Sequence, residues 1–131
     1  MNLTILDKKY SIYRFEVNSI LPDWIYLSDF YSITKTADEV SVVTEQTDQI
    51  SENIPCSKDW RILKIAGPLD FSLIGIIADI SAILKDAKIS IFTISTYDTD
   101  YILLKQRDLK TGIKALTDKK HIISNEKLQT V

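Results

Sequence analysis

Apolar residues in the second half of the chain follow a helical spacing and are flanked by short apolar runs. Between residues 73 and 87 they recur at steps of three and four, which predicts a helix of about four turns with one apolar stripe. Runs rich in β-branched and aromatic residues at 62–65, 89–94 and 101–104 predict short strands. Residues 60–105 are therefore predicted to form strand, helix, strand, turn and strand.

The junction between the first strand and the helix contains residues that are typical of strand ends and helix starts. Gly67-Pro68 is expected to end the strand, because proline cannot donate to a β-ladder. Asp70 and Ser72 are candidate N-caps for the helix. Gly75 falls in the predicted first turn, where a glycine costs about 1 kcal/mol relative to alanine. We therefore expect a packed side chain or a ligand to approach the backbone closely there.

The C-terminal part predicts a second helix and a last strand. Apolar residues at 109, 113 and 116 indicate a helix that begins near Asp108, which can cap it, and residues 121–123 a final strand. The helix and its flanks are basic, but acidic residues are interleaved and aromatic residues are missing. This pattern favours a solvated face over a nucleic-acid surface.

The first half of the chain is organised differently. Residues 10–17 alternate as a strand with Tyr13 and Phe15 on one face, and strands are also expected at 30–35 and 41–45. The T-x-x-E sequence at 36–39 has the form of a capping box but leaves room for about one helical turn. The polar residues 46–59 are predicted to be a linker. We therefore expect a reduced N-terminal unit with its linker at 1–57 and a second domain at 58–131.

Composition narrows the function classes. The chain has 131 residues, 45% of them hydrophobic and 26% charged, which is typical of a soluble globular protein. Its net charge of −2 argues against binding to nucleic acid or to an anionic membrane. A single cysteine, Cys56, excludes an intramolecular disulfide and a cysteine-based zinc site. No apolar run reaches about 18 residues and the start is unlike a signal peptide, so we expect a cytoplasmic protein.

The motifs resemble those of the ACT domain family. The glycine and the apolar positions after it have the spacing of the ACT loop and helix: Gly75, Ile76, Ile77, Ile80, Ile83, Leu84, Ala87, Ile89 and Ile91. The segments GPLDFSLIGI and ISTYDTDYIL resemble the second half of small prokaryotic proteins built of two ACT-like halves. The resemblance implies an α+β, ferredoxin-like βαββαβ fold, with tandem ACT-type units of which the first is reduced. It also implies a regulatory role in binding amino acids at domain interfaces.

An amino acid needs donors for its carboxylate and acceptors for its ammonium group. The start of the predicted helix offers free amides and the positive end of the helix dipole. The segment at residues 95–100 offers hydroxyls and carboxylates, and its tyrosine could line a pocket. The predicted ligand-binding set is Asp70, Ser72, Gly75, Ile76, Ser95, Thr96, Tyr97, Asp98 and Asp100. By resemblance, Gly75, Thr96, Tyr97 and Asp100 carry over from the family motifs, whereas Ser72 and the uncharged Ala78 depart from the pattern and argue against arginine-type ligands.

Other interpretations stay open. Asp98-Thr99 is also what an ordinary hairpin turn would use. The only histidine, His121, has no nucleophile placed beside it and is expected at the surface or a strand end, and Asp98 with Asp100 is a poor metal site alone. P-loop and GxGxxG motifs are absent, so we expect no catalytic residue, metal or cofactor. The hypotheses are an amino-acid-binding regulatory homodimer, an interaction module without a ligand and, least favoured, a small enzyme acting on amino acids.

Overall fold

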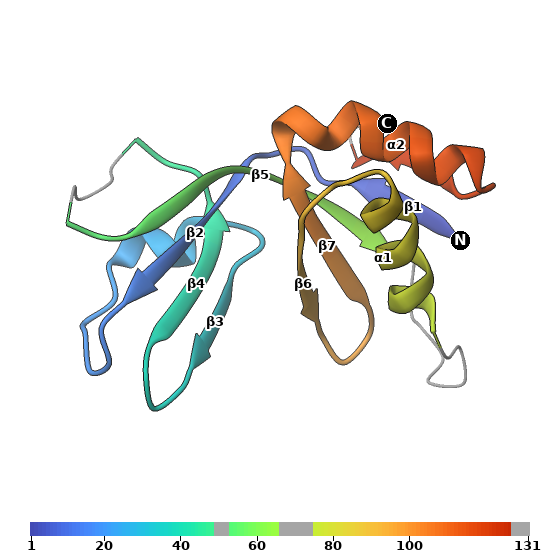
Figure 1. The fold of residues 1–131 in the computed structure, drawn as a ribbon. Coiled ribbons are helices and arrows are strands. Elements are labelled where there is room, and N and C mark those ends of the chain that lie inside the picture. Colours follow the sequence, from blue (N-terminus) through green and yellow to red (C-terminus); the bar gives the residue numbers. More distant parts are fainter. Residues whose placement is uncertain (49–52, 66–74, 127–131) are drawn as a thin grey trace. The chain divides into compact units, whose positions relative to one another are not determined.

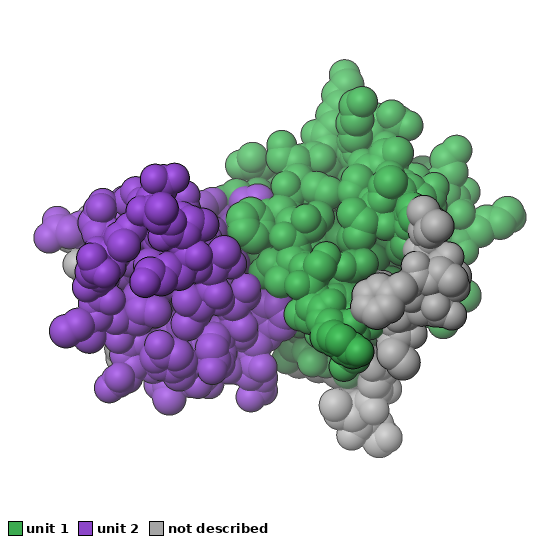
Figure 2. Space-filling model, turned by 90° about the horizontal axis from the view of Figure 1, so that it is seen from below, with its two compact units in different colours: residues 1–7, 61–131 green, residues 8–60 purple. Residues whose placement is uncertain are grey.

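The computed structural model describes residues 1–48, 53–65 and 75–126. It is a mixed α+β protein with two compact units, coloured separately in Figure 2. Unit 1 contains residues 1–7 and 61–131, and unit 2 contains residues 8–60. No helix in the described part of the chain is long and apolar enough to cross a membrane.

Unit 1 has the ferredoxin-like order of elements, as predicted. Its sheet runs β6-β7-β5-β1-β8, and helices α1 and α2 share one core with it (Figure 1). From β5 onward the order is strand, helix, two strands, helix and strand. The elements are β1 (Asn2–Ile5), the C-terminal part of β5 (Cys56–Ile65), α1 (Ile76–Asp86), β6 (Ile91–Ser95), β7 (Asp100–Lys105), the 3-10 turn η2 (Gln106–Asp108), α2 (Leu109–Asp118) and β8 (Ile122–Asn125).

Strand β1 is absent from the sequence prediction, which placed no strand before residue 10. It pairs antiparallel with β5 and parallel with β8, and its Leu3 lies opposite both Ile65 and Ile123. Leu3 and Ile5 are buried in the core of unit 1. A strand of four residues carries little local signal, and its partners lie more than 50 residues away in the sequence. The structure thus groups residues 1–7 with the C-terminal part of the chain, whereas the predicted range 1–57 included them.

Helix α1 begins later than the periodicity indicates. Its N-cap is Gly75, whose φ of 86° is left-handed, and the Gly75 carbonyl accepts the amide of Asp79 at 2.8 Å. A Cβ added to Gly75 would meet no described atom within 4 Å, so no described side chain packs closely against this backbone, and the approach of a ligand stays a prediction. The positive φ explains the glycine instead. Asp70 and Ser72, the predicted caps, lie outside the described residues, and Gly75 occupies the cap position.

Both helices end in the same hydrogen-bonded motif. After α1 the amide of Lys88 donates to the Lys85 carbonyl at 2.8 Å, and that of Ile89 donates to Leu84 at 3.0 Å. Lys88 has a φ of 63°, and Lys120, which follows α2 in the same way, has a φ of 70°. These are Schellman motifs with lysine where glycine is usual. The usual glycine stop signal is therefore missing from the sequence.

Helix α2 begins at Leu109 with Asp108 as its N-cap, where the sequence predicted it. The Asp108 side chain makes no capping hydrogen bond, so the predicted capping role is wrong. In the second turn Gly112 is buried, facing Leu104 of β7 and Leu84 of α1. The core that joins the two helices to the sheet contains Leu3, Ile5, Leu63, Ile65, Ile80, Leu84, Ile89, Ile102, Leu104 and Leu116.

Unit 2 is a small antiparallel sheet in the order β3-β4-β2-β5. Its described residues form no α-helix, which agrees with a reduced first ACT-type unit. Tyr13 and Phe15 point into its core, as their alternation predicted. The elements are β2 (Tyr10–Phe15), the 3-10 helix η1 (Asp23–Leu27), β3 (Ser32–Lys35), β4 (Val40–Glu45) and the N-terminal part of β5.

The T-x-x-E sequence closes a hairpin rather than starting a helix. Thr36 Oγ1 accepts hydrogen bonds from the amides of Asp38 and Glu39, at 3.1 and 3.2 Å. The Thr36 amide donates to the Glu39 carbonyl at 2.9 Å, which completes the turn between β3 and β4. The same threonine chemistry serves a helix cap and a tight turn, and the strands on both sides decide between them.

The predicted linker at 46–59 is wrong for its described C-terminal part. Cys56 to Trp60 belong to β5 and pair with β2, with Tyr13 opposite Cys56 and Tyr10 opposite Trp60. The register shifts along this pair, and Asp59 has a φ of 65°. Polar residues occur here because the side chains of Lys58 and Asp59 are exposed. A bulged, half-exposed strand resembles a linker in composition.

Tyr13 gives unit 2 a predicted sensitivity to alkali. Its ring is buried, and its hydroxyl has no hydrogen-bond partner of good geometry among the described residues. Burial raises the pKa of Tyr13 above its usual 10.0, while nearby Ser11 lowers it and Cys56 raises it. The folded state holds this proton more tightly than the unfolded state, so its contribution to stability is complete below about pH 10 and falls as the pH rises further.

We expect Tyr13→Phe to reduce the loss of stability between about pH 9.5 and 11. At pH 7 it should change the free energy of unfolding by less than about 1 kcal/mol, because it removes a poorly bonded hydroxyl. Urea denaturation of parent and variant across this range measures both effects. Tyr97→Phe, at a mostly exposed position, is the control. Parallel pH curves for parent and Tyr13→Phe would contradict the prediction.

Candidate functional site

The predicted ligand-binding residues of the second motif form the turn between β6 and β7. Ser95 Oγ donates to Asp100 Oδ1 at 2.5 Å. The Thr96 amide donates to the Thr99 carbonyl at 2.8 Å, and the Thr99 amide donates to Thr96 Oγ1 at 3.3 Å. The turn is thus closed by its own side chains. Its hydroxyl and carboxylate groups are held in defined positions at the ends of the two strands.

Thr99 ties this turn to the end of β5. Its side chain is buried, with 5% exposure, and its Oγ1 donates to the Ile65 carbonyl. In Figure 1 the β6–β7 turn and the start of α1 both lie toward the lower end of unit 1. The two halves of the predicted site, the helix start and the turn, therefore lie at one end of one unit.

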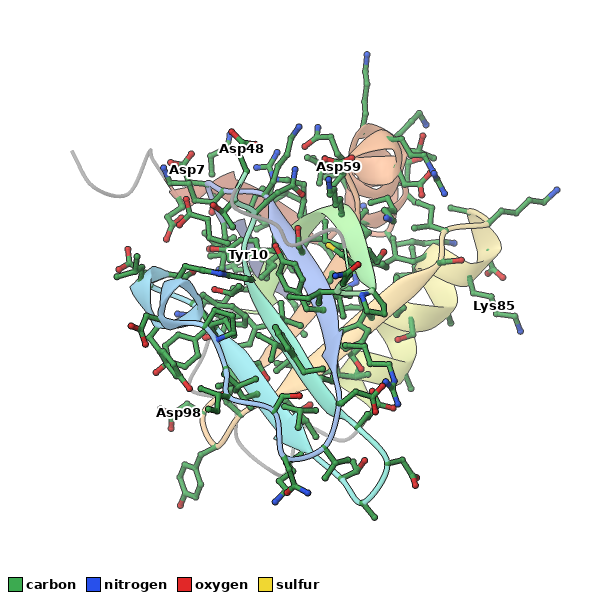
Figure 3. The ribbon with its side chains drawn as sticks, turned by 90° about the vertical axis from the view of Figure 1, so that its left-hand side faces the viewer. Asp7, Tyr10, Asp48, Asp59, Lys85 and Asp98 are labelled. Atoms are coloured by element: carbon green, nitrogen blue, oxygen red, sulfur yellow. The ribbon has the colours of Figure 1, made fainter. Side chains whose placement is uncertain are left out.

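The remaining predicted residues differ in their surroundings. Tyr97 is 85% exposed, and Asp98 lies at the outer tip of the turn, where Figure 3 shows its side chain at the periphery. Gly75 is exposed at the start of α1, and Ile76 packs against the core. The turn brings Ser95, Thr96 and Asp100 together. Asp70 and Ser72 lie outside the described residues, and the assignment of the whole set stays a prediction.

His121 is more buried than the sequence indicated. Its side chain is 8% exposed, and its Nε2 lies 3.5 Å from Asp79 Oδ2 on α1. Its Nδ1 is buried with no hydrogen-bond partner among the described residues. His121 lies at a strand end, directly before β8, which was one of the two expected positions, but its side chain is not at the surface because it lies beside Asp79 in the first turn of α1. No hydroxyl or thiol nucleophile accompanies the ring in the contacts described.

Unit 2 has a pocket that the sequence did not reveal. It has a volume of about 240 Å³ and is lined by Trp24, Leu27, Ser28, Glu45, Gln46 and Thr47. These residues come from η1 with the position after it, and from the end of β4 with the two positions after it. No sequence spacing links the two groups. They meet because buried Thr44 donates its Oγ1 to the Ile25 carbonyl at 2.8 Å, which holds η1 against β4.

The order of elements and the sheet define a class, the α+β proteins with a ferredoxin-like unit. The family model of the ACT domain matches residues 56–118, and a second model, of an N-terminal domain, matches residues 8–55. The chain belongs to the ACT domain family.

Solved structures share the fold of this chain. A protein from Agrobacterium tumefaciens is 32% identical, with 95% of this chain and 92% of that chain covered and a TM-score of 0.87. Aspartate kinase from Clostridium acetobutylicum is 14% identical over 86% of this chain and 33% of its own, with a TM-score of 0.64. Aspartokinase III from E. coli is 11% identical over 88% and 32%, with a TM-score of 0.59. The two kinases are similar to this chain in fold.

Proposed function

We propose that this protein is a regulatory ACT module that binds a small molecule, in the first place an amino acid, at the end of unit 1 formed by the β6–β7 turn and the start of α1. One observation carries the proposal. The Thr99 bond to Ile65 holds the turn beside the end of β5, and the Ser95 bond holds the Asp100 carboxylate within that turn.

The two ends of an amino acid match the two halves of this region. Its carboxylate would bind at the first amides of α1, where the helix dipole is positive and the Gly75 cap places no side chain over the amides. Its ammonium group would bind the Asp100 carboxylate as a charge-assisted hydrogen bond. Residues that complete the proposed set are Asp70, Ser72, Ile76, Ser95, Thr96, Tyr97 and Asp98. This role requires binding and no catalysis.

Proteins with the same fold make amino acids the first ligands to test. E. coli aspartokinase III was solved in complex with aspartate and ADP, and the Clostridium acetobutylicum kinase is described as an allosteric enzyme. In such a module the ligand would act by changing the geometry of paired ACT units in a homodimer. We propose the cytoplasm as its location.

A second function, dimerisation without a small ligand, has its own support. Strand β8 lies at the edge of the sheet in unit 1, and its Ile122 is 64% exposed. An exposed sheet edge with an apolar side chain can pair with another chain. This alternative predicts a stable dimer whose geometry and stability no amino acid changes.

The test of ligand binding is a thermal-shift screen of the full chain against the twenty amino acids. We expect a selective stabilisation that grows as RT ln(1 + [L]/Kd), about 2.7 kcal/mol at a hundredfold excess over Kd. Asp100→Asn should abolish this shift. Asp86→Asn, which removes an exposed carboxylate at the other end of α1, is the matched control and should keep it.

Substitutions at Gly75 test the helix start. Asparagine tolerates the left-handed conformation, so Gly75→Asn should keep the ligand-induced shift. Gly75→Val should lose the shift and lower the melting temperature of the free protein, because valine is strained at this φ. A shift that survives in Asp100→Asn would refute the site. A flat panel, together with a dimer in sedimentation, would favour the interaction module.

A further inference from the structure

The pocket in unit 2 has walls that the fold holds in place. On one side, Ile25 of η1 is fully buried in the core, and its carbonyl accepts the Thr44 hydroxyl. On the other side, the Gln46 amide donates to the Lys9 carbonyl at 2.8 Å. The pocket therefore lies between two segments that each have buried or hydrogen-bonded anchors. It is a fixed feature of unit 2 rather than a gap between loose loops.

Several polar groups in the pocket wall already serve the structure. Gln46 Oε1 accepts the amide of Asp59 at 2.7 Å, and its Nε2 donates to Asp59 Oδ1 at 3.0 Å. Ser28 Oγ donates to the Phe30 carbonyl at 2.5 Å. Glu45 differs from these residues, because the described part of the chain forms no salt bridge with its carboxylate. Glu45 is thus the charged group that the pocket offers to a ligand.

The rest of the lining suits a cation with an apolar part. Trp24 and Leu27 both supply apolar side-chain surface to the lining, and Leu27 is 83% exposed. None of the six lining residues is basic. The volume of about 240 Å³ is below the roughly 300–1,000 Å³ of pockets for drug-sized ligands, so the occupant must be small.

The net charge of unit 2 also favours a cationic ligand. Residues 8–60 contain five basic and nine acidic residues, a net charge of −4, although the whole chain carries only −2. The negative potential around unit 2 therefore raises the local concentration of small cations and lowers that of anions.

We propose that unit 2 carries a binding site for a small primary amine. The ammonium group binds the Glu45 carboxylate, and the short alkyl part lies between Trp24 and Leu27. This site is separate from the amino-acid site proposed in unit 1, and its ligand does not need a carboxylate.

Three probes of four carbon atoms each test this proposal: n-butylamine, 1-butanol and butyrate, whose polar groups are cationic, neutral and anionic. Butylamine is almost fully protonated at pH 7. NMR titration of the full chain should show binding of butylammonium with a Kd of about a millimolar, much weaker binding of butanol, and none of butyrate. The shifted resonances should be the Trp24 indole and the amides of residues 45–47.

Variants assign the charge and the apolar contact. Glu45→Gln should weaken butylammonium binding about fivefold or more. Glu16→Gln makes the same charge change elsewhere in unit 2, at an exposed residue outside the pocket, and should leave the Kd unchanged. Leu27→Ser should weaken butylammonium while leaving methylammonium binding as it was.

The proposal is overturned if Glu45→Gln binds butylammonium as the parent does, or if butyrate binds equally well. It is also overturned if the shifted resonances lie at residues 75–78 and 95–100 of unit 1. Because butylamine has no carboxylate, failure here leaves the amino-acid site standing. Loss of the amino-acid response in Asp100→Asn is likewise independent of the Glu45 result.

Discussion

Gly112→Val is expected to lower the free energy of unfolding by about 1–3 kcal/mol through overpacking of the core. A Cβ at Gly112 would lie 3.0 Å from Leu104 Cδ1, and 3.5 Å from side-chain carbons of Ile89 and Leu84. Valine adds two further methyl groups in a restricted rotamer, so these neighbours would have to move apart. The midpoint of urea denaturation measures the effect.

Alanine at the same position gives a graded comparison. Gly112→Ala removes the helix cost of glycine, about 1 kcal/mol, and its one added carbon is closer than an ordinary contact only to Leu104 Cδ1, the end of a flexible side chain. It should therefore be much milder than valine. Thr111→Val is the control, since it places valine at an exposed position of the same helix and should change stability by about 0.5 kcal/mol or less. Equal midpoints for Gly112→Val and the parent would contradict this account of the core.

Thr44→Val is expected to destabilise the protein by about 1–3 kcal/mol, although it barely changes the side-chain volume. Thr44 is fully buried, and its hydroxyl is a hydrogen-bond donor to the Ile25 carbonyl. Without the hydroxyl this bond is lost inside the protein. Chemical denaturation of the variant measures the loss.

The same substitution connects stability to the proposed amine site. Thr44→Val should loosen η1 from β4 and so weaken butylammonium binding, without changing the charge of unit 2. Thr34→Val, at an exposed position of β3, is the matched control for both measurements. A Thr44→Val variant that kept the parental midpoint would show that this hydrogen bond does not hold η1 in place.

The candidate sites show where sequence reasoning succeeds and where it fails. The motif at 95–100 was recognised because its hydroxyls and carboxylates are neighbours in the chain, and the structure closes them into one turn. The buried bond from Thr99 to Ile65 was missed, since 34 residues separate the partners. The pocket around Glu45 was missed for the same reason. Of its polar residues, Gln46 and Thr47 fall in the predicted linker, whereas Glu45 falls at the end of a predicted strand.

The order of elements from β5 to β8 and the resemblance to the ACT family could both be read from the chain alone. Those strands and helices can be predicted from the spacing of apolar residues within each element, which is a local property of the sequence. Gly75 was likewise visible as a special position, although its cause is a left-handed cap.

Three features depend on long-range contacts: the place of β1, the extension of β5 into unit 2 and the contact of η1 with β4. A four-residue strand such as Asn2–Ile5 has too little burial of its own to be recognised, and it is stable because two distant strands hydrogen-bond to it. Tertiary packing also favours a hairpin over a helix start at Thr36, and it buries the His121 side chain against α1. Local chemistry permitted each alternative, and long-range contacts selected one.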